Sequence, residues 1–154
     1  EKKKKNVLAL FGHPHLSISR IRKEAFINTF KAKAPKTKLE IQYTENGEPS
    51  KQAVIAAFKS VKPPDTIFCM GDLILTGVMR AIHELELKVP EDVAVISISN
   101  GFIPKLFNPV VTYVETSGNK LGMLAFSQML ARLKNGNVPE NVCVDSVLVK
   151  GGSL

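Results

Sequence analysis

Short apolar runs alternate along the chain with segments in which apolar residues recur every three or four positions. The clearest example is the stretch 65–96, where an apolar run ends at Gly71-Asp72, a helical pattern follows over 73–86, and a second apolar run begins at Val93. Continuous short apolar runs are typical of buried parallel strands, and a strand–helix–strand unit joins parallel strands by a right-handed crossover. We therefore expect both runs to lie parallel in one sheet.

The same alternation continues over the rest of the chain. Strand-like and helical patterns follow each other in the order β-α-β-α-β-α-β-β-α-β. This order predicts an α/β fold, namely a doubly wound, mostly parallel sheet with helices on both faces. The strands are expected over 6–11, 38–44, 65–70, 93–98, 110–114 and 142–149, and the helices over 17–34, 50–61, 73–86 and 117–134.

Two helix starts follow from the residues that favour caps. Ser17 or Ser19 is expected to open the first helix, which carries Ile18 and Ile21 near one face. Ser50 is the predicted N-cap of the second helix. Its apolar stripe recurs at helical spacing through Val54, Ala57, Phe58 and Val61.

The last predicted helix differs from the others because it is apolar on two faces. Asn135-Gly136-Asn137 is expected to end it. A lone domain of this size has little use for a second apolar face, so we expect a missing partner layer to cover it. The two faces carry Leu121, Ala125 and Met129 on one side and Met123, Phe126, Leu130 and Leu133 on the other.

Composition is that of one soluble globular domain of 154 residues, with 44% hydrophobic and 23% charged residues. No apolar run approaches the roughly 20 residues of a membrane span, and no signal peptide opens the chain. The sequence starts without methionine and is expected to be a piece of a longer protein. The net charge of +7 comes mostly from dispersed lysines, and the run Lys2–Lys5 is interpreted as a solvated lead-in rather than a nucleic-acid site.

The residues that most enzymes need are not arranged in recognisable motifs. The sequence has no dinucleotide-binding or P-loop glycine pattern and no Gly-x-Ser-x-Gly elbow, so we expect neither an enzyme nor a cofactor. His13 and His15 lack a clear third ligand, which favours ordinary loop histidines over a metal site. Cys69 and Cys143 lie in apolar strand-like runs and are expected to be buried free thiols in a reducing compartment.

Ligands of open parallel sheets gather at the carboxyl ends of the strands, which directs attention to the Gly71-Asp72 turn. Asp72 has two interpretations, helix capping and ligand recognition, and capping is favoured. Arg22 is by default a solvated surface residue. If the first helix begins beside the cleft, its guanidinium would suit a hydroxyl-rich or anionic ligand.

Several spaced motifs resemble the lactose/galactose-repressor family of bacterial transcription regulators. The resemblance covers nearly the whole chain. Asn108–Thr112 is similar to the Pro-Pro-Leu-Thr-Thr of that family, and Arg22–Phe26 to its Arg-x-x-Gly-Phe/Tyr. The other matching segments are Thr66–Asp72, Gly77–Ile82, Leu87–Ile96, Leu121–Leu130 and Leu148–Lys150.

The resemblance implies a periplasmic-binding-protein-like domain of two lobes. Residues 1–116 and 146–154 would form the C-terminal lobe, and residues 117–145 would belong to the other lobe, most of which is missing from this sequence. The N-terminal helix-turn-helix is expected to be absent as well. This division accounts for the last helix with two apolar faces.

The implied function is the effector-sensing part of a cytoplasmic, DNA-binding regulator. A small, sugar-like molecule would bind between the lobes and control operator binding through the missing headpiece. The implied ligand-binding residues are Arg22, Asp72, Ser99, Asn100 and Glu115. The sugar interpretation is weakened at two positions: Gly71 stands where the family usually has asparagine, and Ser99 where it has aspartate.

The resemblance also implies a homodimer that meets partly through the C-terminal lobe. Leu75, Met79 and Leu106 are the candidate interface residues, with core packing as the open alternative. Glu45 falls near a position that is often aromatic in the family. An alternative function is a periplasmic solute-binding protein of a sugar transporter, although Val89–Ile96 is more typical of regulators.

Overall fold

The computed structural model describes residues 5–134 and 139–154, in which strands and helices follow each other in the predicted order. One six-stranded sheet has the order β2-β1-β3-β4-β5-β6; all neighbours are parallel except β5 and β6. The prediction of a doubly wound, mostly parallel α/β fold is thus confirmed. The elements are β1 (Asn6–Phe11), α1 (Ser17–Lys33), β2 (Lys38–Tyr43), α2 (Gly47–Phe58), β3 (Thr66–Cys69), α3 (Asp72–Glu84), β4 (Ala94–Ser99), the 3₁₀ helix η1 (Ile103–Leu106), β5 (Thr112–Glu115), α4 (Gly118–Leu133) and β6 (Val147–Val149).

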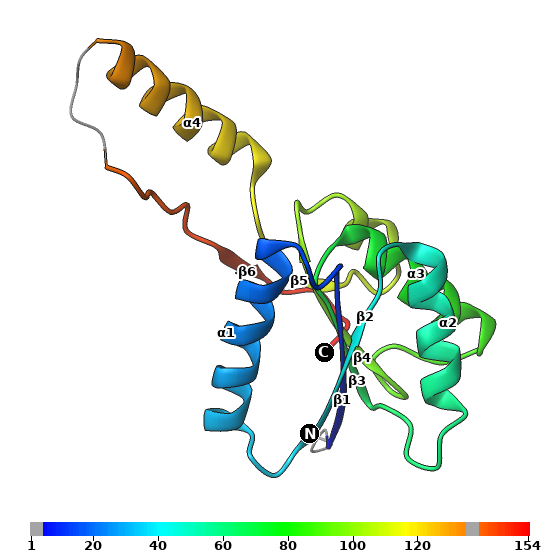
Figure 1. The fold of residues 1–154 in the computed structure, drawn as a ribbon. Coiled ribbons are helices and arrows are strands. Elements are labelled where there is room, and N and C mark those ends of the chain that lie inside the picture. Colours follow the sequence, from blue (N-terminus) through cyan, green and yellow to red (C-terminus); the bar gives the residue numbers. More distant parts are fainter. Residues whose placement is uncertain (1–4, 135–138) are drawn as a thin grey trace.

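The helices form layers on both sides of this sheet, with α1 on one face and α2 and α3 on the other (Figure 1). The central strands are therefore buried from two sides, which explains their continuous apolar sequences. On the α1 side, the ring of Phe26 lies 5.8 Å from that of Phe11 and 4.5 Å from that of Phe68, centroid to centroid. This aromatic cluster attaches α1 to β1 and β3.

The face that α1 turns inward differs from the predicted one. Ile18 and Ile21 are 46% and 65% exposed, whereas Ser19 is fully buried and Phe26 packs on the core. The N-cap of α1 is Leu16, whose side chain makes no capping hydrogen bond. Phe26 is the residue of α1 that reaches the sheet, and Ile18 and Ile21 lie on the exposed side of the helix.

The start of α2 also differs from the prediction. Its N-cap is Asn46, whose side chain accepts a hydrogen bond from the backbone N–H of Glu48 at 3.2 Å. Ser50 lies within the helix and is fully buried, with its hydroxyl 2.8 Å from Thr44 Oγ1. Val61 lies beyond the helix end and is 98% exposed, so it takes no part in the apolar stripe.

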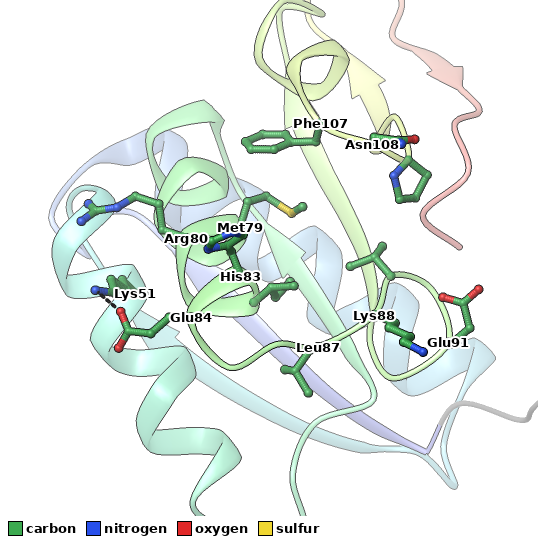
Figure 2. Close-up of a pocket in the computed structure, with 13 residues that line it drawn as sticks. Lys51, Met79, Arg80, His83, Glu84, Leu87, Lys88, Glu91, Phe107 and Asn108 are labelled. Atoms are coloured by element: carbon green, nitrogen blue, oxygen red, sulfur yellow. Dashed lines mark ion pairs between the residues drawn. The ribbon is translucent and has the colours of Figure 1, made fainter.

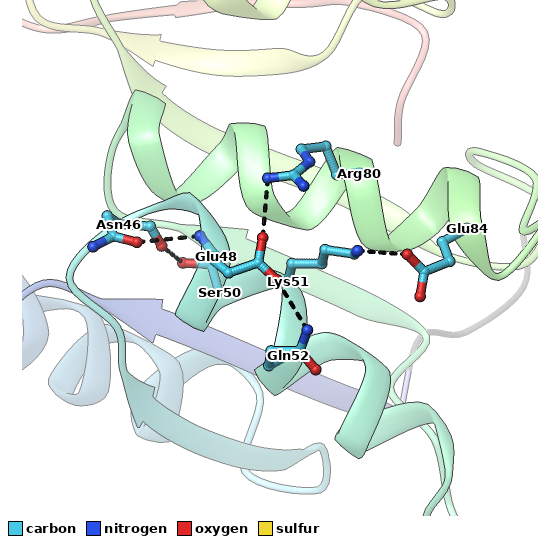
Figure 3. Close-up of polar contacts among 7 residues, drawn as sticks. All are labelled: Asn46, Glu48, Ser50, Lys51, Gln52, Arg80 and Glu84. Carbon is cyan, nitrogen blue, oxygen red and sulfur yellow. Dashed lines mark hydrogen bonds and ion pairs between the residues drawn. The ribbon is translucent and has the colours of Figure 1, made fainter.

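Helices α2 and α3 approach closely because two glycines face each other. A methyl group added to Gly77 would overlap the carbonyl oxygen of Gly47 and lie 2.7 Å from its carbonyl carbon. Ion pairs reinforce the contact outside the glycines: Arg80 lies 3.2 Å from Glu48, and Lys51 pairs with Glu84 (Figure 3). The Arg80–Glu48 pair is exposed on both sides and adds little stability compared with the backbone contact, whereas the Lys51 side chain is largely buried.

The C-terminal segment pairs with the first part of β4, before the residues of β4 that pair with β5. Ser153 is fully buried. Its carbonyl accepts a hydrogen bond from the N–H of Val95 at 2.9 Å, and its hydroxyl accepts one from the N–H of Thr112 at 2.8 Å. Residues at the very end of this sequence therefore hold β4 and β5 together.

Helix α4 extends away from the layered body (Figure 1). No described residue of α4 is buried, and its large apolar side chains are exposed on both predicted faces. Strand β6 is shorter than predicted and begins at Val147, which leaves Cys143 exposed instead of buried. Cys69 is buried as predicted, and this burial raises the pKa of its thiol.

Two predicted features lie outside the described residues: most of the lysine run at Lys2–Lys5 and the turn at Asn135–Asn137. Among the residues that are described, no helix combines the length and apolar character needed to cross a membrane.

The Gly47–Gly77 contact can be tested with Gly77→Ala. We expect this change to lower the free energy of unfolding by about 3 kcal/mol, because the two helix backbones must separate to admit the methyl group. Gly122→Ala on α4 is the matched control, since a methyl group there meets no atom of the described residues within 4 Å. Urea denaturation followed by circular dichroism measures both; equal effects of the two changes would contradict the contact.

Candidate functional site

A cavity of about 500 Å³ opens at the carboxyl ends of three neighbouring strands. The loops that follow β1, β2 and β3 form its walls. This is the edge at which open parallel sheets bind ligands, and it includes the Gly71-Asp72 turn. The lining residues are Gly12, His13, Leu16, Glu45, Met70, Gly71, Asp72, Leu73 and Ile74.

Asp72 is the first residue of α3 and is not its N-cap, so the favoured capping interpretation is wrong in detail. The cap position belongs to Gly71, which has no side chain to offer. The Asp72 carboxylate still lies at the positive end of the helix dipole. Its Oδ2 accepts a hydrogen bond from the backbone N–H of Asn100 at 3.4 Å, which links α3 to the loop after β4. Its Oδ1 is buried and has no hydrogen-bond partner among the described residues.

Ser99 is the last residue of β4, and Asn100 begins the turn that follows it. Ser99 is 2% exposed, and its hydroxyl oxygen accepts a hydrogen bond from the N–H of Gly101 at 2.9 Å. The side-chain oxygen of Asn100 accepts one from the N–H of Phe102 at 3.1 Å. Gly101 has a φ of 94°, a conformation suited to glycine. The buried Ser99 hydroxyl thus holds the turn, while Asn100 stays exposed beside Asp72, and a ligand contact of Ser99 stays a prediction.

Arg22 reaches from α1 to the wall of the cavity. Its guanidinium donates a hydrogen bond to the carbonyl of Met70 at 3.2 Å, and Met70 lines the cavity. The side chain is half-buried, and this desolvation lowers the pKa of the guanidinium. None of the ion pairs found among the described residues involves Arg22. A half-buried guanidinium with donors to spare is suited to a polar ligand.

Glu115 lies at the same edge of the sheet but farther along it. It pairs in register with Ser99 across β4 and β5, and its carboxylate lies 3.9 Å from the ammonium of Lys120. Four of the five predicted ligand residues thus follow the carboxyl edge from β3 to β5, and Arg22 reaches this edge from α1. Only Asp72 lines the cavity itself.

The predicted ligand residues did not include His13 and Glu45, which both line the cavity and contact each other. His13 Nε2 lies 3.4 Å from Glu45 Oε1, and His13 Nδ1 accepts a hydrogen bond from the N–H of His15 at 3.2 Å. Each lies two residues after the end of a strand, which is the signal that could have identified them. Across the described residues, no group of three His, Cys, Asp or Glu side chains could hold a metal ion.

A larger groove of about 1010 Å³ follows the second half of α3 and the loops that lead into β4 and β5 (Figure 2). It contains none of the predicted ligand residues. Met79 lines it together with Phe107 and Pro109, and Leu106 on η1 is 61% exposed. Leu75 is fully buried within the chain. Its proposed interface role is therefore wrong, and core packing explains it.

The chain matches known sequences along its whole length. Residues 1–154 match the family described as a periplasmic binding protein-like domain. Among curated relatives, the HTH-type transcriptional repressor PurR of Escherichia fergusonii is 30% identical over 111 residues, which are 71% of this chain and 32% of the relative. PurR of Actinobacillus pleuropneumoniae is 27% identical over 132 residues, 84% of this chain and 39% of the relative. The chain thus spans well under half the length of these relatives.

Solved structures agree on the fold. A LacI family transcriptional regulator from Bifidobacterium animalis subsp. lactis has a TM-score of 0.87 at 22% identity, over 98% of this chain and 55% of that one. A dimeric Lac repressor with an 11-residue C-terminal deletion has a TM-score of 0.89 at 18% identity, over 98% and 56%. The resemblance to the lactose/galactose-repressor family is confirmed, and the named relatives are repressors rather than enzymes. By its sequence, this chain belongs to the periplasmic binding protein-like domain family, and its fold agrees with that membership.

Proposed function

We propose that the chain is the effector-sensing part of a bacterial DNA-binding transcriptional regulator and that a small, hydroxyl-rich molecule binds at the cavity after β1, β2 and β3. The observation that carries this proposal is the half-buried Arg22 guanidinium, which has no carboxylate partner among the described residues and adjoins a cavity wall. Hydroxyl oxygens of a sugar-like effector accept its free N–H groups. One structural neighbour, a LacI family regulator from Arthrobacter, is titled as a complex with lactose, which supports a sugar-like ligand.

The proposed mechanism is a conformational switch. An effector that binds between two lobes favours the arrangement in which both lobes contact it, and its differential affinity shifts the equilibrium. Asp72 lines the cavity and accepts the backbone N–H of Asn100 in the loop after β4. A ligand contact with Asp72 would therefore also affect the position of that loop. The periplasmic solute-binding alternative is not favoured, because the curated relatives are repressors.

Binding through Arg22 can be tested in the natural full-length protein. We expect Arg22→Ala to weaken the tightest ligand of a monosaccharide and amino-sugar panel by about 10–100-fold, since a charged hydrogen-bond donor is lost. Arg20→Ala, on the exposed side of α1, is the matched control and should leave the affinity unchanged. Isothermal titration calorimetry measures both. If Arg22→Ala binds as tightly as Arg20→Ala, Arg22 lies outside the site.

The proposed domain division assigns residues 1–116 and 146–154 to the C-terminal lobe and residues 117–145 to the other lobe. The exposed apolar side chains of α4 support it, because a helix with this surface is stable in water only when another layer covers it.

Hydrogen exchange tests this division. In the natural full-length protein, the backbone amides of α4 should exchange at least about tenfold more slowly than in the 154-residue chain, because packing against the other lobe suppresses local opening. The amides of α3 already belong to the layered body and serve as the internal control. Equal exchange of α4 in both proteins would argue against the division.

The proposed partners are a small-molecule effector, a second copy of the protein, and operator DNA, which would be bound through a headpiece outside this sequence. Such a regulator works in the cytoplasm. The homodimer proposal is supported by the groove beside Met79 and by the exposed Leu106 at the end of η1.

The dimer contact is testable with Leu106→Glu in the natural full-length protein. A buried, unpaired carboxylate is costly, so we expect the dimer dissociation constant to rise at least about tenfold in sedimentation velocity. Val61→Glu is the control, because Val61 is even more exposed and lies after α2, away from the groove. A dimer unaffected by Leu106→Glu would exclude this residue from the interface.

A further inference from the structure

The cavity after β1, β2 and β3 has a charge opposite to that of the chain. The chain carries 21 Lys and Arg residues against 14 Asp and Glu, for a net charge of +7. The nine described lining residues of the cavity contain two carboxylates, Glu45 and Asp72, and no Lys or Arg. Carboxylates in a concave wall concentrate the field there and attract cations.

Glu45 offers lone pairs to the cavity beyond its contact with His13. His13 Nδ1 accepts the backbone N–H of His15, and His13 Nε2 lies 3.4 Å from Glu45 Oε1. One imidazole nitrogen can occupy only one of the lone pairs of a carboxylate, which leaves the others for a ligand.

Two polar groups at this cavity also lack partners in the described part of the chain. Asp72 Oδ1 is buried without a hydrogen-bond donor, and the hydroxyl of the fully buried Ser19 is likewise unsatisfied. The Ser19 oxygen would lie 3.2 Å from a methyl group on Gly12, which is a lining residue. Buried polar atoms are normally paired, and a carboxylate oxygen is paired only by a donor. Asp72 Oδ1 therefore lacks a hydrogen-bond donor that a ligand could supply.

We infer that the effector of this site is an amino sugar, that is, a hydroxyl-rich molecule with a protonated amine. This inference rests on the proposed function. The ammonium group donates to the carboxylates of Glu45 and Asp72, and the ring hydroxyls accept from the guanidinium of Arg22 at the neighbouring wall. A neutral sugar leaves the two carboxylates without a countercharge, and an anionic sugar is repelled by them.

The size and the apolar part of the wall agree with this class. A cavity of about 500 Å³ lies within the usual range for small-molecule sites. Leu16, Leu73 and Ile74 supply apolar surface for the C–H faces of a sugar ring. Gly71, which brings no side chain into the cavity, leaves space beside Asp72.

The test compares sugars that differ only in an amine. The natural full-length protein is titrated calorimetrically with D-glucosamine against D-glucose and with D-galactosamine against D-galactose. We expect at least one amino sugar to bind about tenfold or more tightly than its hydroxyl counterpart. Glu45→Gln should remove most of that preference, since it keeps the shape and removes the charge. Glu24→Gln, an exposed carboxylate on α1, is the matched control and should keep it.

Each outcome bears on one of the two proposals. Neutral hexoses that bind as tightly as their amino counterparts would overturn the amino-sugar inference and leave the effector-sensing function standing. A preference that survives Glu45→Gln would overturn the assignment of the ammonium to this carboxylate. Binding of none of the four sugars would overturn the inference and also count against a hydroxyl-rich effector at this cavity.

Discussion

The close backbone contact between Gly47 and Gly77 determines the geometry on which the candidate site depends. Gly47 is the first residue of α2, and the loop before it carries Glu45; α3 begins at Asp72. Because no side chain separates the two helices, α2 lies directly against α3, and a methyl group on Gly47 would meet Leu73 O at 3.5 Å. This contact therefore fixes the distance between the loop with one carboxylate and the helix start with the other. A larger residue at Gly77 would have to push the two helix backbones apart.

The second constraint is the direction of the strands. In β1, β3, β4 and β5 the chain leaves the sheet at the same edge, so loops far apart in the sequence become neighbours there. Asp72 uses this arrangement to accept the Asn100 N–H from a loop 28 residues later. One buried polar atom at this edge, Asp72 Oδ1, has no hydrogen-bond partner among the described residues. The same topology thus gathers the candidate site residues and leaves one of their oxygens open to a donor.

The sequence alone predicted the elements, their order and the family, because a parallel sheet covered on both faces requires continuous apolar strands and spaced apolar helix positions. It did not predict which face of α1 turns inward, since the exposed Ile18 and Ile21 are as apolar as the inward Phe26. Asp72 was identified at the cavity from its place after a strand. The burial of Ser99 was not predicted, because it depends on the Gly101 turn, and Glu45 was not selected although it lies soon after β2.

The layered body and α4 differ in how much apolar surface they bury. The body buries its apolar side chains against the sheet and closes β4 and β5 with Ser153, whereas α4 exposes apolar residues on two sides. Glu115 and Lys120, at the junction between β5 and α4, form a long ion pair at 3.9 Å that contributes little to holding α4 in place. The cavity walls belong to the layered body, and in the proposed division the other lobe covers α4 and faces them. The proposed ligand, held by Arg22, Glu45 and Asp72, would therefore act by favouring one arrangement of the surface across the cavity.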